Sequence, residues 1–207
     1  MFNKLFKKVV PGKRYRYVTF GFMLLGGIAA LVAAFVLTLD KFKVLEDPNA
    51  VLSCSMNIVL NCSTVMETWQ SHLFGFPNML ISLMAFPVLI AIAVLGLSGV
   101  KLPHWFLISS IVALFLGFLF SYWLFFESVY VIQVLCPWCL VVTTSMTIML
   151  ASYLHFNLKE NTFKLKEALN TKVQYFLKSG FYQMIVLVWI ALMVVLVFIK
   201  FGQALFA

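Results

Sequence analysis

Hydrophobic residues dominate five long segments of the chain, and polar residues gather between them. Each segment is close to the roughly 20 residues that a helix needs to cross the hydrocarbon core of a bilayer. None shows the alternation of apolar and polar residues, over about 10 positions, that is typical of a transmembrane barrel strand. The pattern predicts an all-α integral membrane protein with five transmembrane helices, forming a single membrane domain over residues 1–207. The predicted spans cover about 17–39, 77–97, 105–126, 136–154 and 181–206.

The first apolar segment follows a basic stretch, as the apolar region of a secretory signal peptide does. That region is only about 7 to 15 residues long and ends at a cleavage site with small residues. The segment here continues to Asp40 without such a site. We therefore expect it to be retained as the first transmembrane helix.

Two polar stretches are long enough to have structure of their own. The stretch 40–76 is predicted to be an exposed loop, in which Val65, Trp69 and Leu73 recur at helical spacing. This spacing predicts a short helix lying in the membrane interface. The lysine-rich stretch 155–180 is amphipathic and is typical of a surface helix or of a contact with anionic lipid.

Composition supports the membrane assignment, and the positions of the basic residues predict the topology. The chain is 63% hydrophobic and 11% charged, whereas soluble domains are about half apolar and about a quarter charged. The net charge of +8 does not indicate nucleic-acid binding, because the basic residues lie beside the apolar segments. Loops rich in Lys and Arg stay in the cytoplasm. With the N-terminus inside and the C-terminus outside, twelve of the fifteen basic residues lie inside, and Lys41, Lys43 and Lys200 lie outside.

This topology places all four cysteines on the outer side of the membrane. Cys54 and Cys62 fall in the first outer loop, and Cys136 and Cys139 fall at the outer start of the fourth span. The outer side is the bacterial periplasm or exterior, or the lumen of the endoplasmic reticulum, where disulfides form and persist.

The sequence Cys136-Pro137-Trp138-Cys139 predicts a reactive pair of thiols. Cys136 has the position of a helix N-cap, and the proline that follows it suits the first helical position. The two cysteines lie one helical turn apart, within reach of a disulfide. The unpaired N–H groups at a helix N-terminus favour the thiolate, which attacks disulfides and quinones.

Three interpretations of the cysteines remain open at this point. A zinc site with four cysteine ligands is possible, although the spacing between Cys54 and Cys62 is wide for such a site. A permanent structural disulfide in the loop would leave the second pair unexplained. A relay by thiol–disulfide exchange uses both pairs, one reaching water and the other reaching lipid, where a quinone is the available oxidant.

Three motifs in this order resemble the vitamin K epoxide reductase family. They are Cys54 to Ser63 with its two cysteines, Phe74-Gly75-Phe76-Pro77, and Cys136-Pro-Trp-Cys139, within residues 17 to 154. The short connection from Cys62 to the second span is similar to bacterial members. Those members often carry a fused thioredoxin-like domain after the fifth helix; this sequence stops there, so we expect a separate DsbA-type or thioredoxin-like partner.

The resemblance implies a four-helix bundle around a menaquinone or ubiquinone, with the fifth helix outside the bundle and the loop covering the site. Cys54 would exchange with the partner protein, Cys62 would pair with Cys136, and Cys139 would lie beside the quinone. The implied location is a bacterial cytoplasmic membrane, with the site facing the periplasm or exterior. The implied activity is quinone-dependent oxidation of protein thiols, which supports disulfide formation in exported proteins.

Further residues are candidates for quinone contacts. The family has a Ser or Thr at the position of Thr68, and Thr143 stands where the animal enzymes have a tyrosine, which argues against epoxide reduction. Trp138 could line the quinone site, although tryptophan also concentrates at bilayer interfaces. Asn78 could donate a hydrogen bond to a quinone carbonyl or make only a helix-start contact. His72 could transfer protons or be a surface residue.

Two other functions can be distinguished from this quinone-dependent oxidation of protein thiols. A DsbB-type quinone reductase has the C-x-x-C pair in its first loop and the spaced pair in its second, the reverse of the order here. A non-catalytic membrane scaffold, with a zinc-binding or structural cysteine cluster, would show no redox-dependent change in its thiols.

Overall fold

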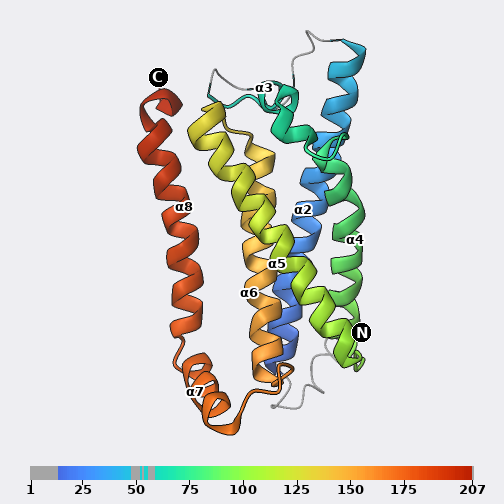
Figure 1. Cartoon of the computed structure of the whole chain (residues 1–207). Helices are drawn as coiled ribbons and strands as arrows, with labels where there is room; N and C mark the ends of the chain where they lie inside the picture. The colour runs from blue at the N-terminus through green and yellow to red at the C-terminus, as the bar shows by residue number, and fades with distance from the viewer. Residues whose placement is uncertain (1–13, 48–51, 53, 56–58, 207) are drawn as a thin grey trace, which may run out of the picture.

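Four long helices form a bundle, and a fifth long helix lies at its edge (Figure 1). The computed structural model describes residues 14–47, 52, 54–55 and 59–206, with side chains as far as residue 202. Five helices are long and apolar enough to cross a membrane. The predicted all-α class and its five candidate spans are confirmed.

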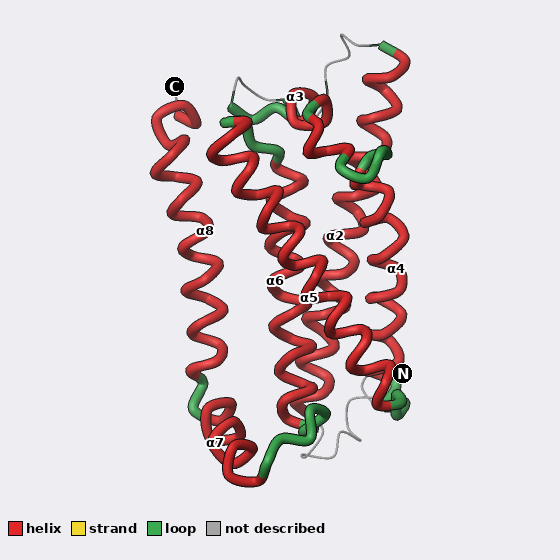
Figure 2. The backbone as a smooth tube through the Cα atoms, viewed as in Figure 1, coloured by secondary structure: helices red, strands yellow, loops and turns green. Residues whose placement is uncertain are grey.

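The bundle consists of helices α2, α4, α5 and α6, whose buried side chains form one apolar core. Apart from the connections at the two ends of the bundle, the described chain is helical (Figure 2). The helices cover Arg14–Glu46 (α2), Asn78–Leu97 (α4), His104–Phe126 (α5) and Pro137–Lys159 (α6). The core includes Phe20 and Met23 of α2, Phe86 and Ile92 of α4, Ile111 and Leu114 of α5, and Met149 and Tyr153 of α6.

Helix α8 (Phe181–Phe206) packs on the outside of this bundle. Its buried residues Met193 and Phe201 meet Tyr122 and Phe125 at the end of α5. The Trp189 ring N–H also donates a hydrogen bond to the Tyr122 hydroxyl, at 2.8 Å. The amphipathic helix α7 (Glu167–Lys178) joins α6 to α8 and contains no buried residue.

Helix α2 continues well beyond the predicted span, and the expectation that residues 40–46 belong to a loop was wrong. Leu37, Asp40 and Val44 are all buried, at helical spacing on one face. Lys43 also forms an ion pair with Asp40, with 3.9 Å between Nζ and Oδ1. The charge of Asp40 interrupts the apolar segment without ending the helix, because its side chain points into the protein.

Two short helices cover one end of the bundle, where a single helix was expected. Helix α3 (Cys62–Glu67) and the 3-10 helix η2 (Trp69–His72) are separated at Thr68, whose backbone is extended. The break turns Trp69 away from a common apolar face, and 64% of its surface is exposed. We call the segment from Cys62 to His72 the cap.

Two hydrogen bonds attach the cap to the bundle. The Gln70 side-chain amide donates to the Glu127 carboxylate at 3.0 Å, and Asn78 Nδ2 donates to the Gln70 carbonyl at 2.6 Å. Glu127 belongs to η3 (Glu127–Ile132), a π-helical turn that extends α5. The cap is thereby held over the space between the four helices.

Candidate functional site

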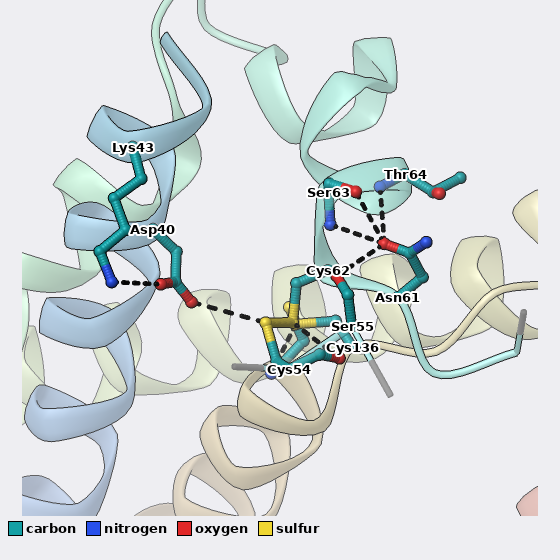
Figure 3. The surroundings of a disulfide bond; sticks show 10 residues. Asp40, Lys43, Cys54, Ser55, Asn61, Cys62, Ser63, Thr64 and Cys136 are labelled. Carbon is teal, nitrogen blue, oxygen red and sulfur yellow. Dashed lines mark hydrogen bonds and ion pairs between the residues drawn. A yellow bond between two sulfur atoms is a disulfide. The ribbon is translucent and has the colours of Figure 1, made fainter. Parts of the chain in front are cut away.

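Three cysteines from two distant parts of the chain meet where the cap begins (Figure 3). Cys54 and Cys62 are joined by a disulfide, and their Cα atoms are 5.7 Å apart. The Cys136 sulfur lies 3.4 Å from the Cys62 sulfur, while Cys136 and Cys139 are free. A thiol at this distance from a disulfide is placed for exchange by direct attack.

A backbone bridge brings the two cysteine pairs together. Leu60 and Leu135 form an isolated parallel β-bridge. The Leu135 N–H donates to the Val59 carbonyl at 2.7 Å, and the Asn61 N–H donates to the Leu135 carbonyl at 3.1 Å. Cys62 and Cys136 follow directly after this bridge, which sets the distance between their sulfur atoms.

The Asn61 side chain caps α3 and connects it to the loop residues beside Cys54. Its carbonyl oxygen accepts hydrogen bonds from the Ser63 and Thr64 N–H groups, at 3.1 and 3.4 Å. It also accepts from the hydroxyl of Ser55, at 3.0 Å. The residues on either side of the disulfide are therefore fixed by one side chain (Figure 3).

Cys136 is the N-cap of α6, as the sequence predicts, and Pro137 is the first residue of the helix. Its sulfur accepts a hydrogen bond from the Cys139 N–H at 3.3 Å. The Cys139 thiol, together with the N–H groups of Cys139 and Trp138, holds the pKa of Cys136 below that of an ordinary thiol. Burial and the charge of Asp40 act in the opposite direction without reversing this effect. Cys136 therefore forms a thiolate more readily than an ordinary cysteine and is a better leaving group than one.

An apolar cavity of about 400 Å³ lies between the four bundle helices, next to the cysteines. Cys136 and Cys139 line it, together with Met66 and Ser71 from the cap. Most of the remaining lining is apolar and comes from α4 and α5, including Phe86, Leu89, Leu114 and Phe125. The cavity suits a flat, mostly apolar molecule held against the end of α6.

The cavity also contains a polar group without a partner. Asn78 is buried, and its Oδ1 atom accepts no hydrogen bond from any residue that the structure describes. Its Nδ2 atom is held by the Gln70 carbonyl, which fixes the orientation of the amide. A buried orphan acceptor is unfavourable unless a ligand or water satisfies it. The amide is therefore a candidate ligand contact.

The other predicted site residues are divided between the cavity and its surroundings. Thr143 lines the cavity, and its hydroxyl donates to the Cys139 carbonyl at 3.0 Å. Thr68 and Trp138 are not among the described residues that line the cavity. Thr68 donates to the Val65 carbonyl within the cap, and Trp138 packs against the buried cysteines. His72 pairs with the neighbouring Ser71 hydroxyl, at 2.7 Å.

Sequence reasoning missed two parts of this site. The Leu60–Leu135 bridge has no local signal, because a single pair of residues so far apart leaves no periodic pattern. Asp40 had a signal in its spacing from Leu37 and Val44, which places it on the buried face of α2.

Comparisons with known proteins give one match. No curated protein and no solved structure matches the chain. The model of the vitamin K epoxide reductase family matches residues 22–154, which include all four cysteines, the cap, the bundle helices α4 and α5 and most of α6. With these motifs, this match and the helical bundle, the chain belongs to the vitamin K epoxide reductase family.

Proposed function

We propose that this membrane thiol–disulfide oxidoreductase oxidises a separate thioredoxin-like or DsbA-type protein and passes the electrons to a membrane quinone. The single observation that carries the proposal is the 3.4 Å between the sulfur atoms of Cys62 and Cys136. This contact connects the loop disulfide to the pair that borders the apolar cavity.

The first stage of the proposed reaction takes place at the loop disulfide. A partner thiolate attacks Cys54, and Cys62 leaves as a thiolate. The second thiol of the partner then displaces Cys54, so that the partner leaves oxidised. Only 3% of the Cys54 surface is exposed in the disulfide form, so a protein partner needs the residues that cover Cys54 to move away.

The second stage carries the disulfide back into the loop. The Cys62 thiolate attacks Cys136 in a Cys136–Cys139 disulfide, and Cys139 is released. Cys54 then attacks Cys62, and Cys136 is released as the thiolate that the N-terminus of α6 stabilises. The loop disulfide with Cys136 and Cys139 free is the redox form expected after this step.

The third stage uses the cavity. A quinone bound there supplies the two-electron acceptor that restores the Cys136–Cys139 disulfide. The residues fit such a molecule, because the walls are largely apolar and Cys139 faces the cavity. The unpaired Asn78 Oδ1 can accept a hydrogen bond from a quinol hydroxyl, and the second N–H of Nδ2 can donate one to a quinone carbonyl. Trp138 and Thr68 act indirectly in this proposal, through the packing of the cysteines and the cap.

The proposed setting is a bacterial cytoplasmic membrane, with the cysteines facing the periplasm or exterior. Helix α3 of the cap, which begins at Cys62, lies at one end of the bundle, and α7 lies at the other (Figure 1). The distribution of basic residues supports the N-in, C-out topology, since Lys-rich segments stay on the cytoplasmic side.

A permanent structural disulfide is the second candidate, because the buried Cys54–Cys62 bond is what such a role would also show. That role gives no purpose to the thiol that contacts the bond. A four-cysteine zinc site is less compatible, since it needs the two thiolates that the disulfide consumes.

The replacement Cys139→Ala in protein reconstituted into lipid nanodiscs tests the proposal. Dithiothreitol serves as the thiol donor and a short-chain ubiquinone as the acceptor, and quinone reduction is followed by absorbance. We expect quinone reduction to be lost in Cys139→Ala. We expect it to be retained in Ser109→Ala, a small change on α5 away from the cavity. Unchanged quinone reduction in Cys139→Ala would refute the mechanism.

A further inference from the structure

A buried carboxylate lies against the loop disulfide, beside Cys54 (Figure 3). Asp40 Oδ2 lies 3.5 Å from the Cys54 sulfur, and only 2% of the Asp40 surface is exposed. Asp40 belongs to α2, so the bundle itself brings it to the site. No step described above uses this residue.

The position of Asp40 is not explained by the stability of the fold. A buried carboxylate is unfavourable unless it is fully paired. The partner Lys43 is 3.9 Å away, and 62% of its side chain is exposed, so the pairing is weak. Asp40 also gains nothing from the helix dipole, which favours acids in the first turn of a helix, whereas α2 begins at Arg14.

The contact between Asp40 and Cys54 improves when the disulfide is reduced. A disulfide sulfur has no proton to donate, whereas a Cys54 thiol can donate a hydrogen bond to Oδ2 at the observed distance. The carboxylate therefore has its best partner in the form of the protein in which Cys54 must next act as a nucleophile.

We propose that Asp40 is the proton acceptor and donor for Cys54, a role that rests on the proposed function above. When Cys54 attacks the Cys62–Cys136 disulfide, its thiol proton moves to the Asp40 carboxylate. The Cys54–Cys62 bond forms, the Cys62–Cys136 bond breaks, and the electron pair leaves on Cys136. When a partner later displaces Cys54, Asp40 returns the proton to the Cys54 sulfur. Over one cycle Asp40 gains and loses one proton.

This transfer avoids creating a new charge in an apolar environment. Cys54 is packed among Leu37, Val44 and Leu52, where burial disfavours its thiolate. A proton moving from Cys54 to Asp40 leaves the net charge of the cluster unchanged.

The same transfer assists the leaving group. The negative charge of Asp40 opposes the thiolate form of Cys136 and so raises the pKa of that thiol. Once Asp40 holds the proton, this opposition disappears at the moment when Cys136 is released as a thiolate. Protonation of Asp40 therefore favours release of the Cys136 thiolate, and release of this thiolate favours protonation of Asp40.

The charged and titratable groups around Asp40 are few among the described residues. Lys43 comes from the same helix, and Lys41 points to the cap, where its Nζ lies 3.4 Å from the Met66 carbonyl. From the facing elements come the sulfurs of Cys54, Cys62 and Cys136. The pH dependence of the rate at which Cys54 attacks is therefore expected to be set mainly by Asp40 and Lys43.

An assay without quinone or partner isolates the step. In a Cys136→Ser, Cys139→Ser background, the reduced loop pair is mixed with glutathione disulfide, so that glutathione on Cys62 takes the place of Cys136. Acid quenching and mass spectrometry follow the loss of glutathione from Cys62 as Cys54 closes the loop disulfide. Three proteins are compared in this background: the parent with Asp40 intact, the Asp40→Asn variant, and the control variant Glu46→Gln. The control removes an exposed acid from the end of the same helix.

With Asp40 present, the closing rate is expected to be nearly flat between about pH 6 and pH 8, because the proton stays inside the cluster. In Asp40→Asn the proton must leave to solvent, so the rate is expected to rise about tenfold per pH unit. Glu46→Gln should match the parent. The same pH dependence in Asp40→Asn and the parent, whatever the absolute rates, would overturn the proposal, since a structural role lowers the rate equally at every pH.

Lys43→Met provides a second test that does not depend on the folding of Asp40→Asn. Loss of the ammonium group favours the protonated carboxyl, so the acid limit of the flat region is expected to move to higher pH. An unmoved limit counts against the proposal. Because this assay contains no quinone, its outcome is independent of the Cys139→Ala experiment, and the two failures are distinguishable.

Discussion

The contact between α2 and α4 permits a sharp prediction about the bundle that carries the site. Gly96 of α4 faces Phe20 of α2 so closely that an added Cβ atom would overlap three atoms of the Phe20 ring. The ring has no room to move away. It is fully buried, and its centroid lies 4.7 Å from that of Phe156 and 6.3 Å from that of Tyr153. Gly96→Ala must therefore separate the two helices or strain the ring.

The expected loss follows from two opposing contributions. Overpacking of a well-filled core costs about 1–3 kcal/mol, whereas replacing glycine by alanine inside a helix contributes about 0.5–1 kcal/mol of stability. The net expectation for Gly96→Ala is a destabilisation of about 1–2 kcal/mol. For a chain of this size each kcal/mol lowers the melting temperature by about 2–4 °C, so a fall of several degrees is expected.

Thermal unfolding in a fixed detergent, followed by the reactivity of a thiol dye or by intrinsic fluorescence, measures this effect. The matched control is Gly21→Ala, next to Phe20 on α2, where an added Cβ meets no atom within 4 Å. It should melt at or slightly above the temperature of the parent. If Gly96→Ala has the same melting temperature as Gly21→Ala, Phe20 does not pack closely on Gly96 and the reasoning is refuted.

Two further predictions concern the site. With the loop disulfide intact, the lowered pKa of Cys136 means that its thiolate persists as the pH falls, so alkylation by iodoacetamide should continue to lower pH than for an ordinary thiol. Cys139→Ala removes the thiol that contributes most to the lowered pKa of Cys136, so the pH profile of Cys136 alkylation should move to higher pH. An unchanged alkylation profile would show that the Cys139 thiol does not lower this pKa. Asn78→Leu removes the hydrogen bond to the Gln70 carbonyl and the amide in the cavity. A loss of about 1–3 kcal/mol should raise the KM for quinone by at least about fivefold, with melting followed in parallel, and an unchanged KM rules out the contact.

The sequence predicted the features that depend on local pattern. Apolar length identified the five candidate spans, and Cys136 followed by Pro137 identified the start of α6. The predicted end of α2 is too early, because Asp40 ends the apolar run in the sequence, whereas the helix continues and buries this acid against the disulfide.

Features that depend on tertiary contacts were not predictable from the sequence. The expected helix around Trp69 is broken because Thr68 adopts an extended backbone between α3 and η2. The contact of Cys62 with Cys136 depends on the bridge between Leu60 and Leu135, which is formed by the packed bundle. Family resemblance supplied this pairing as an expectation, and local residue patterns could not.

The most direct test of the account is whether a disulfide passes between the cap and α6. Cys54→Ser removes the thiol that resolves the mixed disulfide, so membranes containing this variant and an added quinone should accumulate a bond between Cys62 and Cys136. Mass spectrometry of peptides prepared without reduction identifies the bond, and Cys54→Ser with Cys136→Ala is the control. Accumulation of Cys62–Cys136 is the result that the account predicts. A variant in which Cys62 stays free, or pairs with another cysteine, would contradict it.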